Sequence, residues 1–205
     1  MASKIDICNQ ALLKVGADLI ASLDTAGETD TGVIRSAKLC KALYDQALEE
    51  VLRMYTWNCC VARAIPSRLQ DAPSFGYDYA FQLPNDCLRV VAVYEDEGMY
   101  DDGLQWVVEQ GQILCDYEAI YLKYVRKPDN VNILDSLCTQ AVICNLALKL
   151  CVALQLDDDW ATRISNELHG IVMPQARSID TFENKELMLE ESDWILSRNY
   201  DTPII

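Results

Sequence analysis

The sequence of 205 residues contains a single histidine, His169, and this scarcity removes most of the familiar catalytic arrangements. A Ser-His-Asp or Cys-His site could be built only around that side chain, and no serine stands in a G-x-S-x-G motif. Sites that bind a metal through several histidines are excluded, and the sequence has no C-x-x-C pair. We therefore interpret His169 as a surface or half-buried helix residue and expect no metal ion.

The glycines are few and scattered. The eight of them form neither G-x-G-x-x-G nor G-x-x-x-x-G-K-[ST], so no loop is suited to cradle a phosphate. The run Asp157-Asp158-Asp159 precedes an expected helix, where acidic residues favour the N-terminal dipole, and it lacks the D-x-D-x-D-G pattern of a calcium loop. No spacing singles out a carboxylate pair. We expect a protein without cofactor or catalysis, and leave open a small acidic intracellular enzyme with an unrecognised carboxylate site.

Basic residues are also scarce. There are 17 of them against 32 acidic residues, which gives a net charge of −15. Nucleic-acid affinity depends on Lys and Arg that neutralise phosphates, so this balance argues against a DNA-binding groove. It remains compatible with DNA that passes by without being held, and also with an acidic surface that only favours solubility.

Cysteine is abundant, but the pattern does not suggest a disulfide scaffold. The nine cysteines are odd in number, and several of them, Cys40, Cys138, Cys144 and Cys151, lie within apolar runs. Free cysteine packs as a small hydrophobic residue, and we expect that role here. The opening MASKIDICNQ lacks the apolar region of a secretory signal. We therefore expect synthesis in a reducing cytoplasm and nine free thiols.

The most apolar stretch, residues 133–156, indicates the centre of the fold. From Ala141 to Leu156 only Asn145, Lys149 and Gln155 are polar, and neither Gly nor Pro interrupts the run. A membrane span needs roughly 20 apolar residues, and this run is shorter and contains a lysine. The pattern predicts a buried helix around which other helices pack.

Those other helices are predicted from periodicity and end signals. Ser3 and Asp6 resemble a capping box that opens the first helix, and Gly16 is placed to end it. A long amphipathic helix is expected over residues 33–55, another over 159–177 with Pro174 kinking or ending it, and a short one over 184–198. The apolar stripe expected on the helix over 159–177 comprises Trp160, Ile164, Leu168, Ile171 and Val172.

The pattern changes at Trp57 to short runs of β-branched and aromatic residues separated by turn residues. Residues 57–66 are expected to be extended, and strands are expected at 79–84, 88–94, 105–109, 112–115 and 119–126. The predicted fold class is α+β, mainly α: a helical bundle from residues 1–56 and 129–205, with a small antiparallel β-sheet insertion at 57–128.

Four segments in this order resemble a known family. They are SKIDICNQALLKVGADLIASL (3–23), CKALYDQALEEVLRMYTWNCCVARA (40–64), YAFQLPNDCLRVVAVY (79–94) and DWILSR (193–198). The motifs N-x-A-L, Y-D-x-x-L-x-x-x-L leading into W, and L-P-x-D-C-L-R-V follow one another in the chain. Together they are similar to the head-to-tail adaptor family of tailed phages, called tail tubular protein A in short-tailed phages. The similarity is close over residues 3–126 and then depends on the helix pattern and DWILSR.

The resemblance implies a structural virion protein made in the cytoplasm of a bacterial host. Such proteins form a ring, usually of twelve copies, between the portal protein of the filled capsid and the tail nozzle protein. The ring leaves a channel through which DNA passes without specific binding, and no membrane is involved. A related neck connector or head-completion protein is the alternative within the same class.

Two groups of residues are candidate contact sites under this resemblance. The C-terminal segment is expected either to pack on its own bundle or to dock on the portal through Trp194, Ile195, Arg198, Tyr200, Ile204 and Ile205. An acidic hairpin tip is expected either to be a solvated loop or to border the channel or nozzle through Glu95, Asp96, Glu97, Asp101 and Asp102.

Overall fold

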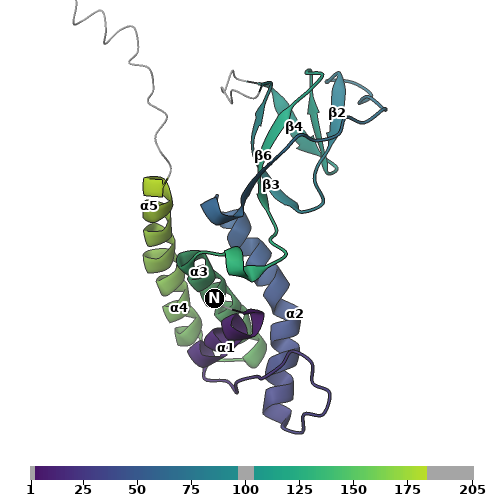
Figure 1. The fold of residues 1–205 in the computed structure, drawn as a ribbon. Helices are drawn as coiled ribbons and strands as arrows, with labels where there is room; N and C mark the ends of the chain where they lie inside the picture. The colour runs from purple at the N-terminus through teal and green to yellow at the C-terminus, as the bar shows by residue number, and fades with distance from the viewer. Residues whose placement is uncertain (1–2, 97–103, 184–205) are drawn as a thin grey trace, which may run out of the picture.

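The computed structural model describes residues 3–96 and 104–183, which form a helical body and a β lobe standing at one end of it (Figure 1). The body contains α1 (Lys4–Val15), α2 (Thr31–Met54), α3 (Ser136–Leu154), α4 (Asp158–Glu167) and α5 (Met173–Glu183). The lobe contains β1 (Val61–Ala64), β2 (Tyr79–Gln82), β3 (Cys87–Tyr94), β4 (Trp106–Glu109), β5 (Gln112–Cys115) and β6 (Tyr121–Arg126). The predicted fold class, α+β and mainly α, is confirmed.

Helix α1 begins and ends where its sequence predicts. The Ser3 side chain accepts a hydrogen bond from the Asp6 backbone N–H, and the Asp6 carboxylate accepts one from the Ser3 N–H, which completes the capping box. At the other end Gly16 adopts φ 67°, a left-handed conformation that glycine adopts without steric cost. Asn9 then fixes the following loop, because its side chain both donates to and accepts from the backbone of Ile20.

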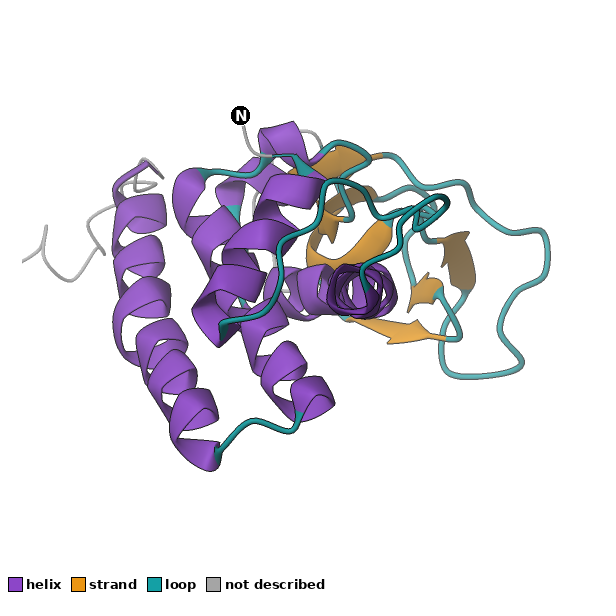
Figure 2. Cartoon of the chain, turned by 90° about the horizontal axis from the view of Figure 1, so that it is seen from below, coloured by secondary structure: helices purple, strands orange, loops and turns teal. Residues whose placement is uncertain are grey.

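Helix α3 lies at the centre of the body, as its apolar sequence predicts. Asp135 caps it by accepting hydrogen bonds from the backbone N–H groups of Leu137 and Cys138. The helix packs against α1, α2 and α4 (Figure 2). By length and composition α3 could cross a membrane, but 56% of its most apolar window is buried within the protein, as in a core helix. Leu146 and Leu150 are fully buried, whereas Leu148 is only half buried at the edge of the core.

The predicted helix over residues 159–177 is longer and less regular than expected. A π-helical turn, Leu168–Val172, joins α4 to α5, and the Met173 N–H bonds to the carbonyl of Leu168. Pro174 follows this turn, and the helix continues to Glu183 instead of ending near residue 177. The wider turn shifts the buried stripe, so Ile171 is 54% exposed. Trp160, in the first turn of α4, is 43% exposed, and the stripe prediction is wrong for these two residues.

The β lobe contains two antiparallel sheets rather than the single sheet that was expected. Their strand orders are β1-β6-β3 and β2-β5-β4. The five predicted strands correspond to β2–β6, and β1 lies in the stretch expected to be extended, where Asn58–Cys60 instead forms a 3₁₀ turn. Side chains from both sheets form a separate apolar core comprising Phe81, Val93, Ile113, Cys115, Ile120, Leu122 and Tyr124.

The lobe is joined to the body at the lower end of the first sheet. Val125 of β6 is fully buried in the core of the body, and Leu88 and Val91 of β3 pack against that core. Trp57, which precedes β1, is also fully buried, and its Nε1 donates a 2.9 Å hydrogen bond to the carbonyl of Val51. The chain thus leaves the core of the body after Cys60 and rejoins it at Val125.

Candidate functional site

The acidic tip predicted from the sequence follows β3. Glu95 and Asp96 come directly after Tyr94, and both are exposed. The other three carboxylates of that prediction, Glu97, Asp101 and Asp102, lie outside the described residues. Strand β3 contacts the body near its beginning, whereas Glu95 and Asp96 follow its end. The described part of the tip therefore lies at the outer end of the lobe.

The residues predicted to dock on the portal also lie outside the described part of the chain. They are Trp194, Ile195, Arg198, Tyr200, Ile204 and Ile205. The predicted helix over 184–198 lies there too. The described chain ends at Glu183 of α5, and α5 points toward the lobe (Figure 1). The Asn58 side chain donates a 3.0 Å hydrogen bond to the Asp180 carbonyl, so the end of α5 lies beside the entry to β1.

Polar contacts hold the lobe against α2. Arg53 Nη1 donates to the Leu88 carbonyl at 2.6 Å, and Arg89 Nη2 donates to Thr56 Oγ1 at 2.6 Å. Lys127 Nζ lies 2.7 Å from a carboxylate oxygen of Glu49, and this hydrogen bond raises the pKa of Lys127. The three contacts join α2 and Thr56, two residues beyond its end, to β3 and to Lys127, which follows β6, so the body and the lobe have a fixed relation.

A group of thiols lies at the same junction. Cys59 and Cys60 have their Sγ atoms 3.8 Å apart, and Cys138 of α3 lies close enough to influence the pKa of Cys59. Hydrogen bonds from Cys138 and Cys60 lower the pKa of the Cys59 thiol, whereas the pKa values of the two donors are raised. All nine cysteines are free, and the four that the sequence places in apolar runs are buried as predicted.

Within residues 3–96 and 104–183, no group of three or more His, Cys, Asp or Glu side chains could hold a metal ion. His169 lies in the π-helical turn and is exposed. The position of His169 agrees with its interpretation as a surface helix residue. Neither observation identifies a chemical centre in the described part of the chain.

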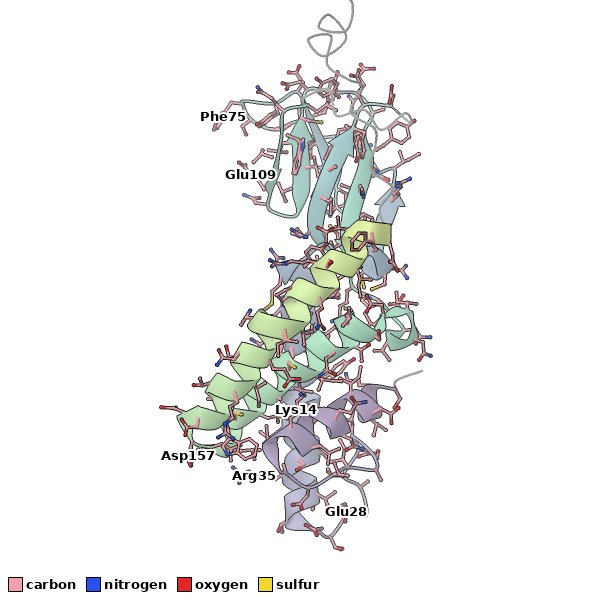
Figure 3. The ribbon with its side chains drawn as sticks, turned by 90° about the vertical axis from the view of Figure 1, so that its left-hand side faces the viewer. Lys14, Glu28, Arg35, Phe75, Glu109 and Asp157 are labelled. Atoms are coloured by element: carbon pink, nitrogen blue, oxygen red, sulfur yellow. The ribbon has the colours of Figure 1, made fainter. Side chains whose placement is uncertain are left out.

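A hollow of about 690 Å³ lies in the lobe between residues 69–77 and the β4–β5 hairpin. Two carboxylates, Asp71 and Glu109, line it, and both are exposed. General acid–base catalysis by carboxylates commonly uses at least one buried carboxyl group, and neither of these two is buried. Phe75 and Glu109 lie on the same side of the lobe (Figure 3).

Exposed apolar side chains are the features that most distinguish this surface. Phe75 is 89% exposed in the loop before β2, and Phe182 is 86% exposed in the last turn of α5. Ile171 and Ile179 are half exposed on the outer side of the helical segment that contains Phe182. Aromatic residues are enriched in the buried centres of protein interfaces, so these positions can serve as anchors for partner proteins.

Sequence reasoning missed both phenylalanines. Phe75 stands in the turn-rich stretch Pro73-Ser74-Phe75-Gly76, where an aromatic residue has no strand or helix to bury it, and this was an available signal. Phe182 had no such signal, because it lies beyond residue 177, where the sequence predicted that the helix would end. The resemblance to adaptor proteins stays a prediction, since comparison of the chain with models of known protein families and with curated proteins finds no match.

Proposed function

We propose that this protein is a structural subunit of the head–tail junction of a tailed phage. Copies of it form a ring, with twelve as the expected number, between the portal protein and the tail nozzle protein. The main observation in support of this proposal is that two of the chain's three phenylalanines are almost fully exposed. Phe75 lies in the lobe and Phe182 on the body. Burying a phenylalanine is worth about 1.5–3 kcal/mol, so both are suited to contacts with other proteins.

The architecture supports this proposal. A ring subunit contacts a copy of itself on each side and other proteins above and below. Phe75 lies in the lobe and Phe182 on the body, and the contacts of Arg53, Arg89 and Lys127 hold these two parts together. Two anchors on one rigid unit can therefore engage two partners in a defined orientation.

The charge supports it as well. The net charge of −15 gives the assembled ring a strongly acidic character. Glu95 and Asp96 are exposed at the outer end of the lobe. DNA that moves along such a surface is repelled and not retained, which suits a channel for ejection. The C-terminal residues 198–205 serve under this proposal as the segment that reaches the portal.

The test is to measure the mass of the purified protein alone and mixed with the portal protein encoded in the same genome, and to image the mixture. We expect a ring, or a monomer that forms a ring on the portal. A stable monomer or dimer that binds neither portal nor nozzle protein would contradict the proposal. Binding to the nozzle protein but not to the portal would favour a connector at another level of the neck.

Two variants test whether the exposed phenylalanines contact other proteins. Phe75→Ser and Phe182→Ser remove exposed side chains, so the melting temperature should stay within about 2 °C of the wild type. Ring formation or portal binding should weaken at least about tenfold for one or both variants, as for interface anchors. Val152→Ser is the matched control, because Val152 is 78% exposed in α3 and is not aromatic. If both phenylalanine variants assemble as well as this control, the exposed rings are not anchors.

A further inference from the structure

One face of the sheet β1-β6-β3 carries paired residues that the fold does not explain. Arg63 of β1 lies directly opposite Lys123 of β6, although like charges in this position destabilise a sheet. Neither side chain forms a hydrogen bond or ion pair with another residue in the described ranges. Beside them Tyr94 lies opposite Tyr121. Together with Ile65, these side chains line a hollow of about 380 Å³, which we call the sheet hollow.

Strand alternation places the sheet hollow on the side of the helical body. Residues two apart on a strand share a face, so Tyr121, Lys123 and Val125 point the same way. Val125 is fully buried against the helices, whereas Lys123 and Tyr121 are only partly covered. The intervening residues of β6, Leu122 and Tyr124, face the core of the lobe. The sheet hollow is therefore the part of the body-side face that extends beyond the body.

The chemistry of the sheet hollow suits an acidic segment with apolar side chains. Arg63 and Lys123 provide two cations that have no partner in residues 3–96 and 104–183, and Ile65, which is 70% exposed, provides apolar surface beside the tyrosines. A nucleic-acid strand also combines negative charge with rings that stack on tyrosine. Its affinity for a protein grows with the number of phosphates neutralised, and two cations in a chain of net charge −15 provide little affinity of this kind. An acidic polypeptide is therefore the better match.

The described chain ends close to this surface. Asp180 contacts Asn58, which precedes β1 by three residues, and α5 ends three residues after Asp180. Residues 184–205 thus start beside the strand that contains Arg63. A dozen residues reach up to roughly 40 Å when extended, so the segment has ample length. The segment is acidic. Its basic residues are Lys185 and Arg198, and its more numerous acidic residues are Glu186, Glu190, Glu191, Asp193 and Asp201.

We propose that the sheet hollow is the docking site of the chain's own C-terminal segment in the free subunit, with acidic residues of 184–193 against Arg63 and Lys123. Apolar side chains of the same segment cover the tyrosines and Ile65. The inference concerns the unassembled protein and stands apart from the proposed function. If both hold, a partner that takes the C-terminal segment uncovers the sheet hollow.

The experiment is limited trypsin digestion of the full-length protein at low salt, with cleavage after Lys185 and Arg198 followed by mass spectrometry. Docking protects these two peptide bonds from trypsin, so the rate of cleavage follows the fraction of molecules in which the segment is undocked. Arg63→Glu with Lys123→Glu should accelerate cleavage at least about fivefold, and so should Glu190→Gln with Glu191→Gln. The four changes together should add little more, because both pairs remove the same contact. For the wild type, 0.5 M salt should give a similar acceleration.

Arg68→Glu is the matched control, because Arg68 is exposed on the lobe but stacks on Tyr79 of the other sheet at 4.2 Å. A melting curve for every variant verifies the fold, and Arg63→Gln with Lys123→Gln provides a milder change. The proposal is overturned if cleavage of the wild type is as fast as that of the variants, or if the two pairs of changes are additive. Protection that is lost on a hundredfold dilution would overturn it too, because the segment would then dock on a second copy.

Discussion

The side chain of Asn58 donates a 3.0 Å hydrogen bond to the backbone carbonyl of Asp180, so the end of α5 is attached to the segment that enters the β lobe. The Asp180 side chain is buried in this contact, and its Oδ2 atom has no hydrogen-bond partner in the described part of the chain. Burial is the main reason that its pKa is raised to about 6, and the nearby carboxylate of Asp135 raises it further.

This shift predicts that stability falls as the pH rises. The folded state retains the Asp180 proton up to about pH 6, whereas the unfolded chain releases it near pH 3.8. The stabilising contribution of the protonated form is complete below the lower value and is lost as the pH rises through the higher one. Asp180→Asn removes the charge, so we expect it to raise the free energy of unfolding at pH 7 by about 2 kcal/mol.

Denaturant unfolding at pH 4, 5, 6 and 7 measures this effect. The difference between Asp180→Asn and the wild type should grow from pH 4 to pH 6 and then level off. Glu183→Gln on the same helix is the control, because Glu183 is exposed, and it should change stability little at any pH. A constant difference across the range would show that Asp180 is ionised in the folded protein.

The cluster of thiols at the junction of the body and the lobe predicts that one cysteine is alkylated selectively. Hydrogen bonds from Cys138 and Cys60 lower the pKa of Cys59, and the thiolate is the reactive form. Cys87 is also partly exposed, but burial raises the pKa of its thiol. At pH 6 iodoacetamide should therefore modify Cys59 well before Cys87, with mass spectrometry to locate the label. After denaturation without a reductant, all nine thiols should react. Faster labelling of Cys87 in the folded protein would contradict the thiolate assignment.

The position of α3 predicts which substitutions abolish folding. Leu146 is fully buried at the centre of the body, so Leu146→Asp places an unpaired charge in an apolar core at a cost of several kcal/mol. We expect insoluble or unfolded protein. Val152→Asp is the control on the same helix, because Val152 is 78% exposed. Its melting temperature should fall by only a few degrees. Circular dichroism and solubility provide the comparison, and a folded Leu146→Asp protein would show that α3 is not central.

Local signals were sufficient to predict most elements of the fold. The ends of α1 follow from Ser3, Asp6 and Gly16, which act within a few residues of their positions. The centre of the body follows from the absence of polar residues in 141–148 apart from Asn145. The buried amide of Asn145 has hydrogen-bond partners, because its Nδ2 donates hydrogen bonds to the Ala47 carbonyl at 3.0 Å and to the Glu50 carboxylate at 3.1 Å.

The features missed by the sequence depend on contacts between distant segments. Two sheets arise because β6 returns between β1 and β3 while β5 pairs with β2 and β4, and strand patterns alone do not determine partners. The pairing of Arg63 with Lys123 joins residues 60 positions apart, so no local motif predicts it. The exposure of Ile171 depends on one π-helical turn, which a 3.6-residue period does not anticipate.

The acidic tip gives a prediction specific to the proposed ring. Five carboxylates lie between residues 95 and 102, and the two described ones, Glu95 and Asp96, are exposed at the outer end of the lobe. Replacing all five by Asn or Gln keeps their shape and removes the repulsion of phosphates. We expect rings that assemble normally but retain DNA more strongly at low salt, measured by co-sedimentation at 0.02 M and 0.2 M salt. The difference should vanish at the higher salt, where the Debye length falls below about 10 Å. Replacing Asp157, Asp158 and Asp159 by Asn is the control, because Asp157 is the N-cap residue of α4 and the other two begin it, at the end of the body away from the lobe (Figure 3). If both variants retain DNA equally, the effect is one of net charge and the tip does not border the channel.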